Sequence, residues 1–314
     1  MKITELRNRV NEVLFSQHAY GLTVYACIKE NADYSLKKLQ MTDALKESVK
    51  TLVQRMARIV YLSEEAELEN FQNISDNRKI LYEVPQTDLY SPFCFLDDYH
   101  HVTDTYNEQD QSKTIGYFFR VNRNDTYIWF FQMLYPIHLL DRSKELYAVL
   151  GKGETYTILD KDIMRFDNRL DLAIVNGSII TEKISILQKY FGFEDYIRSE
   201  AHKTVLEIEA LNLLSDTAKF MDFINKERLT NAKKLMKVKN SPVLKMNKTE
   251  LFRRLQKHPR YQNKFKYDGD TIVIKTQKDV NDFIKMLNDD IVRSDLTDQE
   301  YDSPSKQILA PLNQ

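Results

Sequence analysis

The sequence predicts an α+β protein: a mostly antiparallel, β-rich N-terminal domain over residues 1–150, then a hairpin-plus-helices C-terminal domain over 151–314. Short runs of β-branched and aromatic residues before residue 150 favour strands. Turn chemistry at 122–125 and at Asn176-Gly177 favours antiparallel hairpins. Beyond Ile184 the apolar residues take up a helical period. The composition changes near residues 147–154, which sets the predicted boundary.

In the first domain, apolar residues at helical spacing predict helices at 1–14 and 45–60, the second with Thr42 as its N-cap. The predicted strands cover 22–28, 79–84, 115–121 and 126–135. The last strand contains Trp129, the only tryptophan, and is expected at the centre of the sheet.

The acidic and aromatic segment 97–110 lacks periodicity, so we expect an exposed loop. It contains His100 and His101 among aspartates. Adjacent histidines seldom reach one metal ion in good geometry, so the loop is the better interpretation.

In the second domain, strands are predicted at 155–159, 170–175 and 178–181, the last two joined by the Asn176-Gly177 turn. A long helix follows Gly192 and extends to Leu214, and a further helix spans 220–229. A strand at 271–275 and a helix at 280–287 complete the pattern, and the tail after Asp302 is expected to be irregular.

The composition argues against secreted, membrane-spanning and nucleotide-binding classes of protein. The 314 residues are 42% hydrophobic and carry a net charge of −1, and the only cysteines are Cys27 and Cys94, which indicates a reduced, cytoplasmic compartment. The polar start resembles no signal peptide, and the apolar stretch 127–140 is too short to span a bilayer. Seven scattered glycines form no phosphate-binding loop, so neither a cofactor nor a metal is expected.

The most informative stretch is the basic segment, residues 226–266. It contains ten lysines and four arginines against Glu227 and Glu250, a net charge of +12 that leaves −13 for the rest of the chain. Such an asymmetry is typical of a polyanion-binding site, most often for nucleic acid. The alternative is an ordinary solvated surface.

Apolar spacing places two short helices in the basic segment. Leu229, Ala232 and Met236 form one stripe. Beside it we expect a single fan of four lysines, Lys226, Lys233, Lys234 and Lys237. Asn247 caps a second helix that stops before Pro259. The cations expected to contact DNA are Lys226, Lys233, Lys234, Lys237, Lys239, Lys245, Lys248, Arg253, Arg254, Lys257, Arg260, Lys264 and Lys266. Because lysines outnumber arginines, we expect contacts to the phosphate backbone with little sequence preference.

Three aromatic residues, Tyr261, Phe265 and Tyr267, alternate with cations at the end of the segment. They are suited to stack on bases, but residues that alternate in a strand more often pack a core. Both interpretations remain open at this point.

Two groups of residues in the second half of the chain form a familiar pattern. They are Phe166-Asp167, 172–180 and 190–194, then Leu287-Asn288-Asp289-Asp290 with Ser294, Leu296, Thr297, Tyr301 and Lys306. With these residues, the chain over roughly 155–309 resembles the KwaB proteins of the Kiwa anti-phage defence system. The resemblance implies a non-catalytic effector that binds phage DNA, blocks its replication and expression, and works with KwaA, a small membrane protein.

This resemblance places the protein in the cytoplasm, peripheral to the inner membrane through its partner. A homodimer or higher homo-oligomer is expected, although no residue pattern defines the oligomeric state. The alternatives are a metal-dependent nuclease that uses Asp160-Lys161-Asp162 and Glu182-Lys183, or a scaffold that docks an acidic protein. The first domain of this chain is itself a candidate for the acidic partner of that scaffold.

Overall fold

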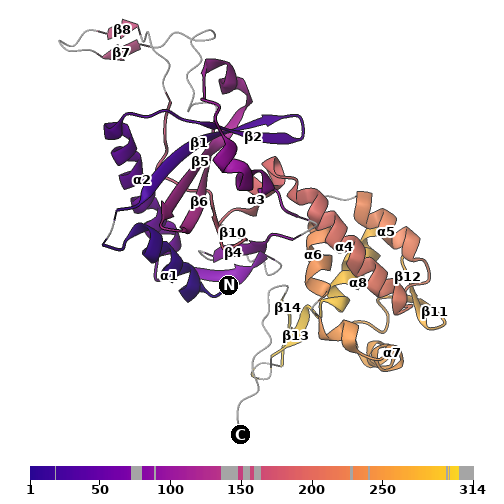
Figure 1. The fold of residues 1–314 in the computed structure, drawn as a ribbon. Helices are drawn as coiled ribbons and strands as arrows, with labels where there is room; N and C mark the ends of the chain where they lie inside the picture. Colours follow the sequence, from indigo (N-terminus) through magenta and orange to yellow (C-terminus); the bar gives the residue numbers. More distant parts are fainter. Residues whose placement is uncertain are drawn as a thin grey trace. The chain divides into compact units, whose positions relative to one another are not determined.

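The computed structural model describes residues 1–17, 19–71, 80–87, 90–135, 148–150, 156–158, 164–226, 229–239, 241–294, 296 and 298–303. Contacts divide the chain into two compact units, one ending at Phe191 and the other beginning at Gly192. Figure 1 colours the chain from indigo at its N-terminus to yellow at its C-terminus. Helices and strands are mixed in it, so the predicted α+β class is confirmed.

The first unit is built on a sheet that has eight strands within the described residues, in the order β2-β1-β5-β6-β9-β10-β4-β3 (Figure 1). The strands are β1 (Gly21–Glu30), β2 (Asp33–Lys38), β3 (Glu67–Asn70), β4 (Ile80–Pro85), β5 (Thr114–Arg123), β6 (Thr126–Met133), β9 (Leu172–Val175) and β10 (Ser178–Thr181). Neighbours pair antiparallel except β3 with β4, which are parallel. The predicted sheet, with Trp129 on an inner strand, is therefore confirmed.

Two helices cover one face of this sheet, α1 (Ile3–Leu14) and α2 (Asp43–Tyr61). Their apolar stripes pack on sheet residues such as Phe119 and Phe130, which are fully buried. The Thr42 hydroxyl accepts a hydrogen bond from the Leu45 N–H at 3.3 Å, so the predicted N-cap is confirmed. Both helices thus begin and end within about two residues of the ranges that their periodicity predicts.

The other face of the sheet is aromatic. Phe93 and Phe131 pack on Phe191, which follows helix α3 (Ile184–Tyr190), and Phe118 packs on both Phe93 and Phe131. The Phe93 and Phe191 ring centroids are 4.7 Å apart. Phe93 precedes the 3₁₀ helix η2 (Cys94–His101), and η3 (Glu108–Lys113) follows with an Asn107–Asp110 capping box. The prediction of a loop at 97–110 was therefore wrong in part, because local capping and packing against the aromatic face order short helical turns there.

The predicted turns are confirmed by backbone geometry. Asn124 between β5 and β6 has φ 51°, and Asn176 and Gly177 between β9 and β10 have φ 49° and 75°. Asn176 and Gly177 thus both have the positive φ that a type I′ hairpin turn requires, whereas the β5–β6 turn has positive φ at Asn124 and not at Asp125.

The two edge strands of the sheet, β2 and β3, are polar and were not predicted. Lys38 of β2 is covered by residues 104–106, because its N–H donates to the Asp104 carbonyl (2.9 Å) and its carbonyl accepts from the Tyr106 N–H (3.1 Å). At the opposite edge β3 carries Glu67 and Glu69. Each strand carries very few apolar residues, Tyr34 and Leu36 in β2 and Leu68 in β3, so the alternation is too short to be recognised.

The second unit contains α4 (Phe193–Ala210), α5 (Thr217–Lys226), α6 (Thr230–Val238), η5 (Pro242–Lys245), α7 (Lys248–Lys257) and α8 (Gln277–Leu287). Its hairpins are β11 (Lys266–Asp268) with β12 (Thr271–Val273), and β13 (Ile291–Arg293) with β14 (Glu300–Asp302). Helix α4 packs against α5 and α6, and both of these pack against α8. Phe220 and Phe283 meet edge-on at 5.4 Å in the core. Helix α4 ends four residues before the predicted Leu214, at a turn where Asn212 has φ 50°.

The contact-defined units divide at Phe191/Gly192, whereas the composition placed the boundary at 150/151. The reason is that β9 and β10 complete the first sheet by pairing with β6 and β4. Near the predicted boundary the structure describes one small hairpin, β7 (Ala148–Leu150) with β8 (Tyr156–Ile158). The predicted irregular tail lies outside the described residues beyond Ser303.

Candidate nucleic-acid interface

The basic segment runs from the end of α5 through α6, η5 and α7 to β11. Lys226 is the last residue of α5, whereas Lys233, Lys234 and Lys237 lie on α6. The predicted single fan of these four lysines is therefore wrong, because a helix boundary separates the first from the others. The three lysines of α6 are also half-buried, since that helix buries five of its nine residues.

Helix α7 agrees with its prediction. The Asn247 side chain accepts from the Thr249 N–H at 2.9 Å, and the His258 N–H donates to the Arg254 carbonyl where the helix ends. Leu251, Phe252 and Leu255 are buried. Arg253, Arg254 and Lys257 are exposed on the opposite side, as the apolar spacing predicts.

Glu250 lies among the exposed cations of α7. Its carboxylate accepts from Nε of Arg253 and from Nε of Arg254, each at 2.6 Å. These two hydrogen bonds lower the pKa of Glu250 to about 2. The carboxylate is therefore charged at any physiological pH and offsets part of the positive charge of α7.

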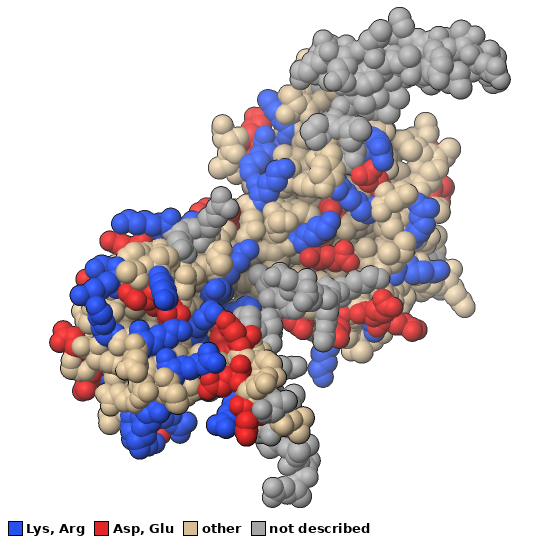
Figure 2. All heavy atoms as spheres, turned by 180° about the vertical axis from the view of Figure 1, so that it is seen from behind, with Lys and Arg blue, Asp and Glu red and all other residues tan. Residues whose placement is uncertain are grey.

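Acidic residues from outside the segment pair with three more of its cations. Lys264 Nζ lies 3.0 Å from Asp282 of α8, and Lys239 Nζ lies 3.7 Å from the buried Glu200 of α4. Arg260 forms an ion pair with Glu300 of β14. Figure 2 shows the result, with basic and acidic side chains interspersed over the second unit. The surface is thus less positive than the count along the sequence indicates.

Four lysines remain exposed and form no ion pair with the residues that the structure describes: Lys226, Lys245, Lys257 and Lys266. Lys266 still lies near enough to Asp279 to help lower the pKa of that carboxyl. Lys248 lies over the Phe252 ring, with Nζ 5.8 Å from its centroid. An exposed lysine without an internal partner keeps its full charge for a phosphate. These four are the best candidates within the segment.

The aromatic residues of the segment belong to the core. The buried rings of Tyr261 and Phe265 stack on each other at 6.0 Å, and Tyr267 meets Phe252 edge-on at 6.0 Å. Burial raises the pKa of Tyr261 to about 12. Core packing, rather than stacking on bases, is therefore their role in this structure.

The residues considered for a nuclease do not form a site among the described residues. Glu182 and Lys183 are exposed after β10, and Asp160, Lys161 and Asp162 lie outside the described residues. No group of three or more His, Cys, Asp or Glu residues suited to hold a metal occurs in the described part of the chain, and His100 and His101 belong to no such group. Within that part, no helix has both the length and the apolarity needed to cross a membrane.

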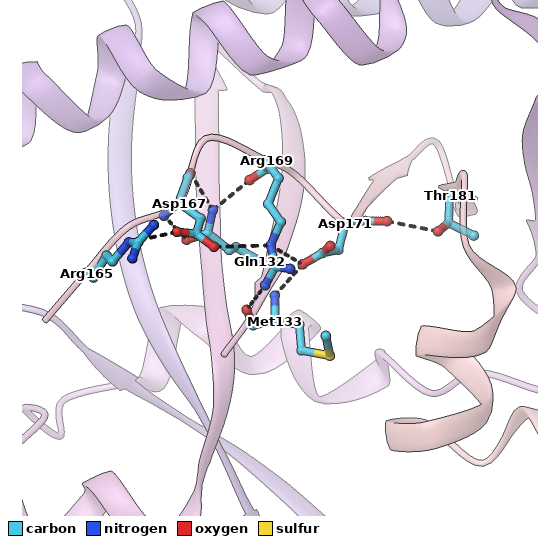
Figure 3. Close-up of polar contacts among 7 residues, drawn as sticks. All are labelled: Gln132, Met133, Arg165, Asp167, Arg169, Asp171 and Thr181. Carbon is cyan, nitrogen blue, oxygen red and sulfur yellow. Dashed lines mark hydrogen bonds and ion pairs between the residues drawn. The ribbon is translucent and has the colours of Figure 1, made fainter. Parts of the chain in front are cut away.

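A buried polar network in the first unit was not predicted (Figure 3). The Gln132 amide of β6 donates to the carbonyls of Asp167 (2.8 Å) and Arg169 (2.6 Å), and accepts from the Asp167 N–H. Asp171 accepts from the Met133 N–H at 2.6 Å, and Arg169 lies between the two aspartates. The network ties the segment before β9 to the end of β6, which gives Asp167 a structural role.

The closing residues of the second unit also have structural roles. Asn288 donates to the buried Asp290 at 2.7 Å after the end of α8, and Asp289 adopts φ 54°. The Ser294 hydroxyl accepts from the Leu296 N–H in the β13–β14 turn. The Tyr301 hydroxyl contacts Gln299 at 3.3 Å. Thr297 and Lys306 lie outside the described residues.

Comparison with known proteins assigns the chain to a protein family. Residues 111–297 match the family described as "Kiwa protein KwaB-like", which is more than half of the chain, so the chain belongs to this family. The family supports a role in anti-phage defence. A relative is the Kiwa protein KwaB of Escherichia coli O55:H7 (strain RM12579 / EPEC), 27% identical over 180 residues. That alignment spans 54% of this chain and 55% of the relative, about half the length of each. No solved structure matches.

Proposed function

We propose that this protein is a non-catalytic effector of Kiwa anti-phage defence that binds DNA with little sequence preference. The observation that carries the proposal is the set of exposed lysines Lys226, Lys245, Lys257 and Lys266, which form no ion pair with the described residues. Family membership supports the defence role. In this proposal a KwaA-like membrane partner holds the protein at the inner membrane, a homo-oligomer forms, and bound phage DNA is neither replicated nor expressed.

The salt dependence of duplex binding tests the proposal. We expect the variant Lys245→Gln/Lys257→Gln/Lys266→Gln to bind all sequences about equally more weakly. Because each phosphate contact contributes about 0.9 to the slope of log affinity against log salt, the slope should flatten by roughly 2–3. The matched control neutralises Lys2, Lys38 and Lys183, exposed lysines of the first unit, and should leave the slope unchanged.

A gain-of-function variant sharpens the test. Glu250→Gln removes the carboxylate that Arg253 and Arg254 share, so both guanidinium groups become available to phosphates. We expect tighter duplex binding and a slope steeper by up to about 1. If both variants bind like the wild type at every salt concentration, the basic segment is ordinary solvated surface.

The same preparations separate the alternatives. A metal-dependent nuclease would nick supercoiled DNA in Mg²⁺ or Mn²⁺, and changing Glu182 or Asp160 would abolish the nicking. A scaffold for an acidic protein would bind an acidic partner but no duplex. The proposal requires duplex binding with the DNA left intact.

A further inference from the structure

A cavity of about 380 Å³ opens on the first unit. Its lining comes from separate parts of the chain and includes Asp97 of η2, Asp125 of the β5–β6 turn, Tyr127 and Trp129 of β6, and Asn176 of the β9–β10 turn. The volume lies near the lower end of the ~300–1,000 Å³ typical of small-ligand pockets. A single ring system with a sugar fits such a volume better than a long or branched ligand.

Trp129 of β6 lines the cavity, and its side chain is only 3% exposed. Its indole N–H is the one donor that this ring can offer to a ligand. Beside it the Tyr127 ring is 44% exposed, which leaves an aromatic face open to a ligand. The wall therefore offers a flat apolar surface and one donor.

Two guanidinium groups already lie at or near the aromatic wall of the cavity. The Arg120 guanidinium lies 3.9 Å from the centroid of the Tyr99 ring and 5.2 Å from that of Tyr127. At the cavity, Arg9 is fixed by the Asn176 side-chain oxygen at 3.2 Å. A cationic ligand on the aromatic rings would therefore meet repulsion from guanidinium groups that are already in place.

The carboxylates of the cavity supply acceptors. Asp97 and Asp125 are exposed and form no ion pair with the described residues. Carboxylates accept hydrogen bonds from the amino groups of bases, such as the N4 amino group of cytosine. Aromatic side chains stack on bases or contact their edges. The combination of a flat wall, two acceptors and one donor matches the edge and face of a nucleobase.

We propose that this cavity binds one unpaired nucleobase that carries an exocyclic amino group. The base lies against Tyr127, donates an amino hydrogen to Asp125, with Asp97 as a second acceptor in the cavity, and accepts from the Trp129 indole N–H. Thymine has no exocyclic amino group, so it binds more weakly. The base comes either from a free nucleoside or nucleotide or from a single strand, and the cavity chemistry is the same for both. This inference is independent of the proposed duplex binding.

Trp129 makes the test direct, because it is the only tryptophan of the chain. Its fluorescence, excited where tyrosine does not absorb, is followed while guanosine, adenosine, cytidine, thymidine or a short single-stranded oligonucleotide is added. Free N-acetyltryptophanamide corrects for absorption by the bases. We expect a saturable change with the three amino-bearing nucleosides and a several-fold weaker affinity for thymidine. If the nucleosides and the oligonucleotide bind with equal affinity, the ligand is a free nucleoside or nucleotide. If only the oligonucleotide binds, the ligand is a base of a single strand.

A pair of matched variants tests the geometry. Asp125→Asn removes one charged acceptor from the cavity, and we expect the affinity to fall about tenfold or more. Asp98→Asn makes the same change at an exposed neighbour of Asp97 that does not line the cavity, and should leave the affinity unchanged. Thermal melts confirm that both variants are folded.

Three results would overturn the inference: no saturable change with any nucleoside or oligonucleotide, an equal loss in Asp125→Asn and Asp98→Asn, or a stronger response to arginine amide than to the nucleosides. The outcome is separable from that of the duplex experiment. The triple lysine variant should keep the nucleoside response of Trp129, and Asp125→Asn should keep the salt slope of duplex binding.

Discussion

Among single residues, Asp171 combines burial with charge. It is 9% exposed, its carboxylate accepts from the Met133 N–H at 2.6 Å, and the Arg169 Nε lies 3.6 Å away. Burial nevertheless raises the pKa of Asp171 above its ordinary value of 3.8, because loss of hydration outweighs these two contacts. The network of Figure 3 is thus held together by hydrogen-bond geometry more than by charge.

This raised pKa predicts a pH dependence of stability. At pH values just above 3.8, the folded state binds more protons at Asp171 than the unfolded state, so this residue's contribution to stability falls as the pH rises toward the folded-state pKa. Asp171→Asn keeps an oxygen that accepts from the Met133 N–H but does not titrate. We expect the melting temperature of the variant, relative to the wild type, to increase with pH across this window. A difference that stays constant with pH would contradict the raised pKa.

For the cations of the basic segment, exposure could be predicted from the sequence, but their acidic partners could not. Their exposure on α7 follows from the spacing of its apolar residues. Their acidic partners Glu200, Asp282 and Glu300 do not, because these lie up to 40 residues away along the chain and are brought close only by packing. The Gln132–Asp167 contact and the cavity depend on tertiary structure in the same way.

At the scale of elements, strand β5 approaches β6 closely at Gly116. A Cβ placed on Gly116 of β5 would lie 2.3 Å from the Phe131 ring and 2.5 Å from the Gln132 carbonyl oxygen. A contact of that length with backbone of the neighbouring strand cannot be relieved by rotating a side chain. Glycine at this position therefore sets how closely the two strands approach.

We expect Gly116→Ala to lower the free energy of unfolding by about 1–3 kcal/mol, since the strands must separate to admit the methyl group. Gly21→Ala is the matched control on β1. Its Cβ would meet only the Asn122 side chain, which can turn away, so a smaller loss is expected. Chemical denaturation of both variants measures the difference, and equal losses would show that the contact at Gly116 relaxes.

The elements that sequence predicts well are those whose signal is local. The Asn176-Gly177 turn, the Thr42 cap and the end of α7 at His258 all depend on neighbouring residues. Strands β2 and β3 were missed because polar edge strands carry little periodicity. The contact-defined boundary at Phe191/Gly192 differs from the predicted one for a related reason, since β9 and β10 join a sheet whose other strands all precede them in the chain.

At the scale of the whole molecule, the net charge of −1 combines +12 in the basic segment with −13 elsewhere. Anionic lipid headgroups repel the acidic majority of the chain. We therefore expect the protein to sediment with membranes that contain a KwaA-like partner and only weakly with bare anionic vesicles. The triple lysine variant serves as the control for attraction through the segment alone. Equal sedimentation with both kinds of membrane would contradict a protein-mediated attachment.

The edges of the large sheet have a consequence for aggregation. An open strand edge is a template on which another chain can add a strand. Here residues 104–106 already occupy the backbone groups of Lys38 on β2, and Glu67 and Glu69 place like charges on β3 at the far edge. Two copies that met edge to edge at β3 would bring these carboxylates together. The covered residue at one edge and the charged side chains at the other are features that disfavour edge-to-edge pairing of two copies.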